Sequence, residues 1–187
     1  MHVLPPLAGA ALLLATVTHP AAPAGKKTRP HLVVIDANRE IRKSGYQRIL
    51  DREEWTKVWL RNLGQEQRYF GRPGQEDGYD CLHDPAGVPV VNFEDCMVIA
   101  VFGGAGVNRA GLNADSLVER EDAVVLRYSP KSYQTGQEGV PVSVYGFFVV
   151  PRSAKAVVLE EGVVELIGQK PKWQERKRFA SLPSDSR

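Results

Sequence analysis

The stretch VIAVFGGAGVNRAGLNAD, residues 98–115, decides the fold because it carries an apolar strand into a series of closely spaced glycines. Glycines bind a phosphate when their backbone N–H groups surround it and a helix N-terminus follows them. Gly104 and Gly106 begin such a pattern, but Arg109 stands where the third glycine is needed, and no Gly-Lys-Ser/Thr sequence ends the stretch. We therefore interpret the glycines as a long connection between two strands, and the sequence predicts no bound cofactor.

The residues after the glycines fit two structures. LNADSLVERE, residues 112–121, could begin a helix at Asn113 or run through a turn into the strand-like AVVLRY, residues 123–128. Short apolar runs separated by Gly, Pro and Ser favour strands throughout this half of the chain; they span residues 97–102, 123–128, 141–150, 154–161 and 163–168. Two further extended segments, 31–37 and 40–50, precede them.

One helix is predicted upstream of these strands. Asp51 can cap it, Glu54 occupies the capping-box position, and apolar residues follow at helical spacing until Gly64: Trp55, Val58, Trp59 and Leu63. The two tryptophans could form a platform on which a ligand stacks, but a buried helix face is the simpler interpretation. The pattern predicts an α+β fold that is mostly β, with an antiparallel sheet curled into a sandwich or open barrel and one amphipathic helix near the N-terminus.

The domain organisation follows from composition. Residues 7–17, LAGAALLLATV, have the length of a signal-peptide core, and Ala22-Pro23-Ala24 supplies a small-x-small cleavage site. We expect a signal peptide over residues 1–24, a single domain over 25–168 with a long surface excursion at 65–89, and a basic, flexible tail over 169–187. The mature protein is then exported, to the periplasm or the extracellular space; an uncleaved membrane anchor is the alternative.

The formal net charge of +2 implies no bulk attraction to nucleic acid or to an anionic membrane. The charge is uneven, however, because basic residues outnumber acidic ones after Glu165, with Trp173 and Phe179 among them. Basic residues near aromatics can bind phosphates or membrane surfaces, but a solvated tail is the more common structure for such a terminus. We therefore expect neither a nucleic-acid partner nor stable membrane insertion after cleavage.

The chain has only two cysteines, Cys81 and Cys96, and an exported protein usually oxidises such a pair to a disulfide. Cys81 lies in DGYDCLHD, residues 77–84, which also offers ligand types for zinc or calcium. The spacing matches no specific metal site, and a Cys-x-His pair on one loop does not place the imidazole to deprotonate the thiol. A disulfide is the first interpretation, a metal site the second and a nucleophilic thiol the third.

The order of these segments resembles the PrcB-like family, named for a subunit of a bacterial protease complex. The resemblance covers roughly residues 32–161 and rests on DREEWTKVW (51–59), VNFEDCMVIAVFGG (91–104), an Asn-Arg-Ala-Gly segment (108–111) and PVSVYGFFVVPRSAKAVVLEE (141–161). In that family the glycine loop usually ends in Thr-Gly-Gly and an aromatic residue. Gly111 fits this pattern, whereas Arg109, Ala110 and Leu112 depart from it. The resemblance implies an exported accessory domain that associates with another protein and stabilises it.

The inventory of residues also favours a protein without catalytic activity, because only His31 and His83 remain after cleavage. The first hypothesis is a protein-binding domain whose partner is another exported protein, such as a protease. We expect partner contacts from Val107, Asn108, Arg109, Gly111 and Leu112. Arg109 could instead pair with Asp115 or Glu119. The alternatives are a protease inhibitor that resembles the chagasin-like β-sandwiches and a metal-dependent hydrolase built on Asp80, His83 and Asp84.

Overall fold

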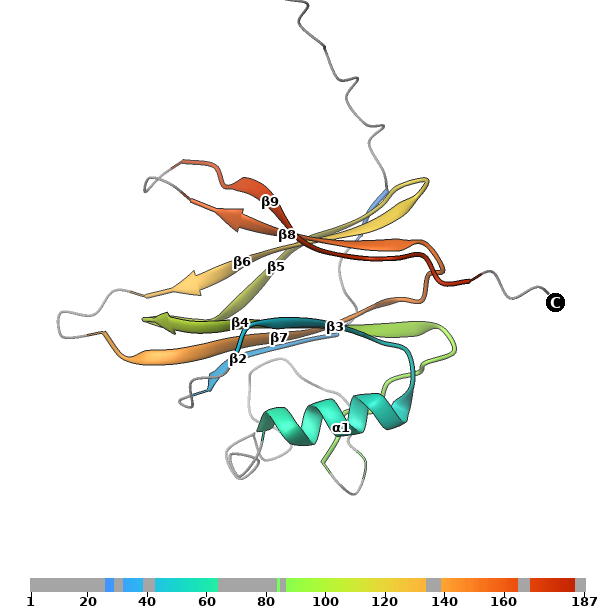
Figure 1. The fold of residues 1–187 in the computed structure, drawn as a ribbon, viewed down its shortest axis with the longest axis horizontal. Coiled ribbons are helices and arrows are strands. Elements are labelled where there is room, and N and C mark those ends of the chain that lie inside the picture. Colours follow the sequence, from blue (N-terminus) through green and yellow to red (C-terminus); the bar gives the residue numbers. More distant parts are fainter. Residues whose placement is uncertain are drawn as a thin grey trace, which may run out of the picture.

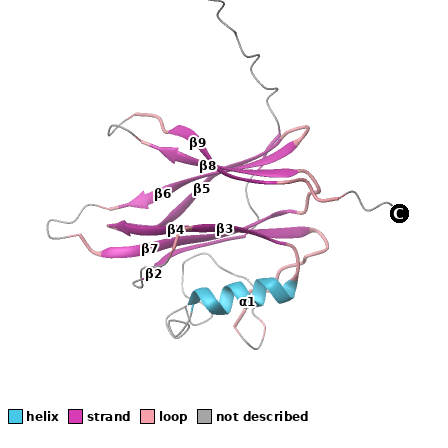
Figure 2. Cartoon of the chain, in the orientation of Figure 1, coloured by secondary structure: helices cyan, strands magenta, loops and turns pink. Residues whose placement is uncertain are grey.

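Two sheets packed face to face form the body of the protein in the computed structural model, which describes residues 26–28, 32–38, 43–63, 84, 87–133, 139–164 and 169–183 (Figure 1). The five-stranded sheet contains, in spatial order, β1 (Lys26–Thr28), β5 (Arg109–Glu119), β6 (Ala123–Ser132), β8 (Ala156–Val163) and β9 (Lys172–Phe179). The four-stranded sheet contains β2 (Leu32–Asn38), β7 (Pro141–Pro151), β4 (Cys96–Val107) and β3 (Gly45–Ile49). Helix α1 (Arg52–Leu63) lies on the outer face of the four-stranded sheet (Figure 2).

The predicted α+β, mostly β fold is confirmed: it is a sandwich, and the described strands do not close into a barrel. One pair departs from the predicted antiparallel order, because β6 and β8 are parallel. The chain leaves β6 for β7 in the other sheet and then returns through β8. Two reversals of direction separate β6 from β8, so the two strands run the same way when they pair.

The main core lies between the two sheets. Met97, Ile99 and Val101 of β4 and Phe148 of β7 face residues of the five-stranded sheet that include Leu126. The alternate residues of β4, Val98 and Ala100, face the opposite way, toward α1. Successive side chains of a strand point to opposite faces, so a strand covered on both faces is apolar without interruption. This explains why the run before the glycines shows no polar alternation.

Helix α1 begins where the sequence predicts. Asp51 Oδ1 accepts a hydrogen bond from the backbone N–H of Glu54 at 2.8 Å, which satisfies one of the free N–H groups of the first turn. Trp55 and Trp59 pack against Phe147 of β7, with ring centroids 5.1 and 5.6 Å from it. Both tryptophans are buried, and Trp55 Nε1 donates to the carbonyl of Pro89 at 2.9 Å. The interpretation of the tryptophans as the buried face of the helix is therefore confirmed.

The C-terminal segment differs from the flexible tail expected over residues 169–187. Lys172–Phe179 forms strand β9, which pairs antiparallel with β8 and extends the five-stranded sheet (Figure 1). Phe179 packs against the main core. The sheet therefore extends past the domain boundary expected at residue 168. The physical reason is that β8 leaves its outer edge unpaired, and an added strand satisfies the N–H and C=O groups of that edge.

Several predicted segments lie outside the described residues. These are the signal peptide, most of the excursion at 65–89, and Cys81 with its proposed bond to Cys96. Within the described part of the chain, no helix is both long enough and apolar enough to cross a membrane.

Candidate protein-binding site

The glycine-rich connection predicted from the sequence is much shorter in the structure. Strand β4 continues through the glycines to Val107, and β5 begins at Arg109, so Asn108 alone joins the two strands. Because β4 and β5 belong to different sheets, Asn108 is the point at which the chain crosses the sandwich. A strand, not a helix, follows the glycines, so the helix N-terminus that a phosphate loop needs does not form there.

Asn108 fixes this crossing through its backbone and its side chain. Its φ of 54° lies in the left-handed region, which asparagine tolerates better than most residues. The N–H of Asn108 donates to the carbonyl of Val140 at 3.2 Å, and its Oδ1 accepts from the N–H of Val140 at 3.1 Å. Its carbonyl accepts from the N–H of Tyr133 at 2.9 Å. One residue thus holds both ends of the connection between β6 and β7.

These contacts define a surface that we name the Asn108 corner; it consists of Val107, Asn108, Arg109, Lys131, Tyr133, Gly139 and Val140. Two glycines make its close packing possible. A Cβ atom at Gly106 would lie 2.6 Å from Cδ of Arg109, and one at Gly139 would lie 2.0 Å from Cγ1 of Val107. The missing side chains therefore leave room for the arginine stem and the valine, and both side chains are held in place by neighbouring backbone.

The Asn108 corner gathers exposed apolar side chains. Three of the six large hydrophobic residues that are exposed in the described part of the chain lie on it: Val107 at 57%, Val140 at 48% and Tyr133 at 41%. Single exposed hydrophobic residues are ordinary on protein surfaces, but a cluster at one place marks an interaction site more often than chance would. The cluster brings together residues from three strand ends.

The same corner carries positive charge that the rest of the described protein does not neutralise. The side chains of Arg109 and Lys131 make no hydrogen bond and no ion pair with the residues that the structure describes. The pairing of Arg109 with Asp115 or Glu119, which the sequence allowed, does not occur. Arg109 and Glu119 are the first and last residues of β5, and the Glu119 carboxylate accepts from Lys155 Nζ at 2.8 Å. Arg109 is half-buried, and its side chain lies against the backbone of Gly106.

Three of the five predicted contact residues lie on this surface and two do not. Val107, Asn108 and Arg109 are on the corner, whereas Gly111 and Leu112 are buried in the sandwich. Leu112 is 1% exposed and packs in the main core, so a partner cannot reach its side chain in this structure. The reason is that the strand resumes directly after Asn108 and turns Leu112 inward.

Tyr133 and Val140 are members of the site that sequence reasoning missed. They lie 25 residues or more from Asn108 and reach it only through the pairing of β5 with β6 and of β4 with β7. The available signal was an aromatic residue and a valine flanking the otherwise polar segment QTGQEG, residues 134–139. Such residues are unusual in a polar connection unless they pack or bind.

Of the three residues proposed for a metal centre, the structure describes only Asp84. Asp84 is described, and its carboxylate accepts from Arg52 Nη2 at 2.8 Å and from the N–H of Val88 at 2.9 Å. Asp80 and His83 lie outside the described residues. Among the residues that the structure does describe, no group of three or more His, Cys, Asp or Glu side chains could hold a metal ion.

Cys96 stands at the beginning of β4 and is half-buried. Burial raises the pKa of its thiol, and the negative charge of Asp95 raises that pKa further. A raised pKa lowers the fraction of reactive thiolate near neutral pH. The Cys96 thiol therefore does not have the environment of an activated nucleophile. Its bond to Cys81 stays a prediction.

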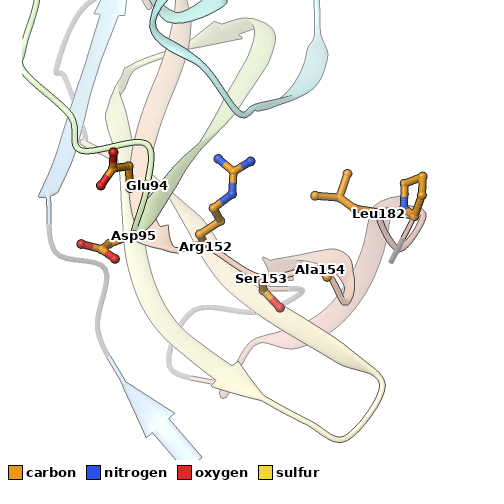
Figure 3. A pocket seen from close by; sticks show the side chains of 7 residues that line it. Glu94, Asp95, Arg152, Ser153, Ala154 and Leu182 are labelled. Carbon is orange, nitrogen blue, oxygen red and sulfur yellow. The ribbon is translucent and has the colours of Figure 1, made fainter. Parts of the chain in front are cut away.

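A surface pocket of about 410 Å³ lies at the other end of β4, where Arg152 stands between an acidic pair, Glu94 and Asp95, and Leu182 (Figure 3). Arg152 Nη1 donates to the carbonyl of Phe93 at 2.6 Å and to that of Leu50 at 3.0 Å. Neighbouring Arg48 donates to the carbonyls of Ser153 and Ala180. Burial lowers the pKa of Arg48, and the positive charge of Arg152 lowers it further. We interpret these arginines as structural: Arg48 ties the C-terminal segment to the sandwich through Ala180, and Arg152 joins the segments before α1 and β4.

The basic residues of β9 are largely neutralised by neighbouring acidic residues. Arg176 Nε bonds Glu161 at 2.6 Å, and Arg178 Nη2 bonds Glu175 at 2.8 Å. The ammonium group of Lys177 lies 5.6 Å from the centroid of the Phe179 ring. A surface that binds nucleic acid needs cations that are free to contact phosphates. The pairing on β9 favours a structural strand over a phosphate-binding one.

A scan against protein-family models found no match, and neither a curated protein nor a solved structure matched the chain. The resemblance to the PrcB-like family therefore stays a prediction.

Proposed function

We propose that this chain is a non-enzymatic protein-binding domain that contacts its partner through the Asn108 corner. The proposal rests on one observation. Three exposed apolar side chains, and an arginine without an ion-pair partner among the described residues, lie together where the chain crosses between the sheets. Three hydrogen bonds of Asn108 hold this crossing. Arginine and aromatic residues are enriched at the positions that dominate binding energy. A surface that is already rigid loses less conformational entropy when a partner binds.

The resemblance to the PrcB-like family supports a more specific form of the proposal. It implies that the partner is another exported protein, that it belongs to a protease complex, and that this domain stabilises it. The predicted signal peptide supports export to the same compartment.

The test is recovery of the partner by a tagged full-length chain, cross-linked in the envelope of its own host. Arg109→Ala is the test variant, and we expect it to weaken binding by about 2 kcal/mol, roughly thirtyfold in affinity, as for an interface anchor. Arg120→Ala is the matched control. Arg120 is also half-buried, its side chain has no bond to the described residues, and it follows the opposite end of β5.

Both variants must keep the melting temperature of the parent, so that a loss of recovery reports binding and not unfolding. Loss of the partner with Arg109→Ala alone supports the proposal. Equal recovery with both variants would place the functional surface away from the corner.

A protease inhibitor is the second candidate, and one observation favours it. The crossing at Asn108 and the connection between β6 and β7 lie together at one end of the sandwich, where an inhibitor of the chagasin-like type inserts its loops into a peptidase cleft. Dose-dependent inhibition of a peptidase by the parent, and its loss with Arg109→Ala, would favour this candidate over an accessory subunit.

A further inference from the structure

The charges on the Asn108 corner have one sign in the described structure. The segments that meet there, residues 105–109, 131–133 and 139–142, contain two charged residues, Arg109 and Lys131, and both are cationic. Neither has an ion-pair partner among the described residues. Some other described cations are paired, as in Arg127–Glu160 at 2.6 Å, and others, such as Arg120, are not. Among the described residues, therefore, none neutralises the two cations of the corner, although the formal charge of the whole chain is only +2.

The side chain of Arg109 lies against the backbone of Gly106. It lies so close that a Cβ there would come within 2.6 Å of Cδ and 2.8 Å of Nε. A guanidinium can donate two parallel hydrogen bonds to a carboxylate. Lys131, which is exposed, adds a second cation on the neighbouring strand, because β5 and β6 pair at Arg109 and Ser132.

Apolar surface lies directly beside these cations. Val107 and Val140 flank Asn108: the Val140 N–H donates to Asn108 Oδ1, and the Val140 carbonyl accepts from the Asn108 N–H. Tyr133 joins them through the bond from its N–H to the carbonyl of Asn108. A partner that covers the three apolar side chains must also meet the charge of Arg109. Complementary charge at that point favours binding, and a cation there would be repelled.

We infer, on the basis of the proposed function, that the partner presents an acidic and apolar protein segment to the Asn108 corner. A carboxylate of that segment contacts Arg109, and its apolar side chains contact Val107, Val140 and Tyr133. A single-stranded nucleic acid is the competing anion. It is disfavoured because nucleic-acid sites carry many more cations than two and rely on phosphate contacts for affinity. Apolar side chains such as the two valines make no use of a phosphate backbone.

The experiment uses the full mature chain and fluorescein-labelled peptides of ten residues, measured by fluorescence polarisation. One peptide alternates leucine with aspartate, the second leucine with asparagine, and the third leucine with lysine. A thymidine decanucleotide with the same label is the fourth probe. We expect the aspartate peptide to bind at least about tenfold more tightly than the asparagine peptide, because one charge-assisted pair contributes roughly that factor. The lysine peptide and the oligonucleotide are expected to bind more weakly still.

The charge-reversal variant Arg109→Glu tests whether Arg109 sets the charge preference. We expect it to lose the preference for the aspartate peptide and to bind the lysine peptide more tightly than the parent does. Arg120→Glu is the control and should keep the parent's order of affinities. Equal binding of the three peptides, no binding of any peptide, or tightest binding of the oligonucleotide would each overturn the inference.

Failure of the inference and failure of the proposed function can be separated. Val107→Ser changes apolar contact without changing charge, and its effect is measured on partner recovery from the host envelope. If Val107→Ser abolishes recovery of the partner while the peptides show no charge preference, the corner binds its partner, and only the inference that the partner segment is acidic is wrong. If it leaves recovery at the parent level, the proposed function fails as well.

Discussion

At the scale of single residues, Asn108 has the largest influence on the candidate site. It takes a left-handed conformation, with φ of 54°, and bonds to the backbone at both ends of the connection between β6 and β7. Glycine could adopt the same conformation but has no side chain to accept the N–H of Val140. Asparagine supplies both the conformation and the acceptor, which explains its use at the point where the chain passes between the sheets.

We expect two substitutions of Asn108 to lower the free energy of unfolding by different amounts. Asn108→Gly should lower the free energy of unfolding by about 1 kcal/mol, the net value of one hydrogen bond. Asn108→Ala should lower it by about 2 kcal/mol, because alanine loses that bond and also resists the left-handed conformation. Urea denaturation of both variants and the parent measures the difference. Equal stability of the two variants would show that the conformation of residue 108 is not a constraint.

At the scale of elements, sequence and structure agree where one segment carries its own signal. The stripe of Trp55 and Trp59 and the cap at Asp51 predicted α1, because spacing and capping are local properties. The apolar run 97–102 predicted a strand for the same reason, and Met97–Val101 are buried in the structure.

The remaining features depend on distant partners, so no local pattern could show them. The crossing at Asn108 places β4 and β5 in different sheets, and the parallel pairing of β6 with β8 results from a strand in the other sheet. Tyr133 and Val140 reach the candidate site by the same long-range pairing. Strand β9 was missed because KWQERKRF looks like a solvated tail, although Glu161 and the unpaired edge of β8 make it a strand.

The assignment of β9 leads to a prediction that a flexible tail would not share. Deletion of residues 169–187 removes β9 and the contact of Phe179 with the main core, and it leaves the edge of β8 unpaired. We expect a loss of at least about 2 kcal/mol in stability, or roughly 4–8 °C in melting temperature for a domain of this size. The control is deletion of residues 184–187, which should leave the melting temperature unchanged. Two truncations with the parent's stability would argue that β9 adds nothing to the fold.

At the scale of the whole molecule, the two ends of β4 have different tasks. Near its first residue, Arg48 and Arg152 bond backbone carbonyls, and Arg48 holds the C-terminal segment through Ala180. At its last residue, the Asn108 corner presents apolar and cationic side chains. The strand has 12 residues, so these regions are about 35 Å apart along it. Variants at one end therefore test binding without disturbing the tether at the other.

The most direct test of the central claim is site-specific photo-cross-linking in the host. Benzoylphenylalanine replaces Val107 in one full-length variant and Val90 in another; Val90 is 45% exposed but lies beside the start of β4. We expect light to join the partner to the chain labelled at position 107 and to leave the chain labelled at position 90 free. A partner captured from position 90 and not from position 107, or from neither position, would contradict the claim that the Asn108 corner binds another protein.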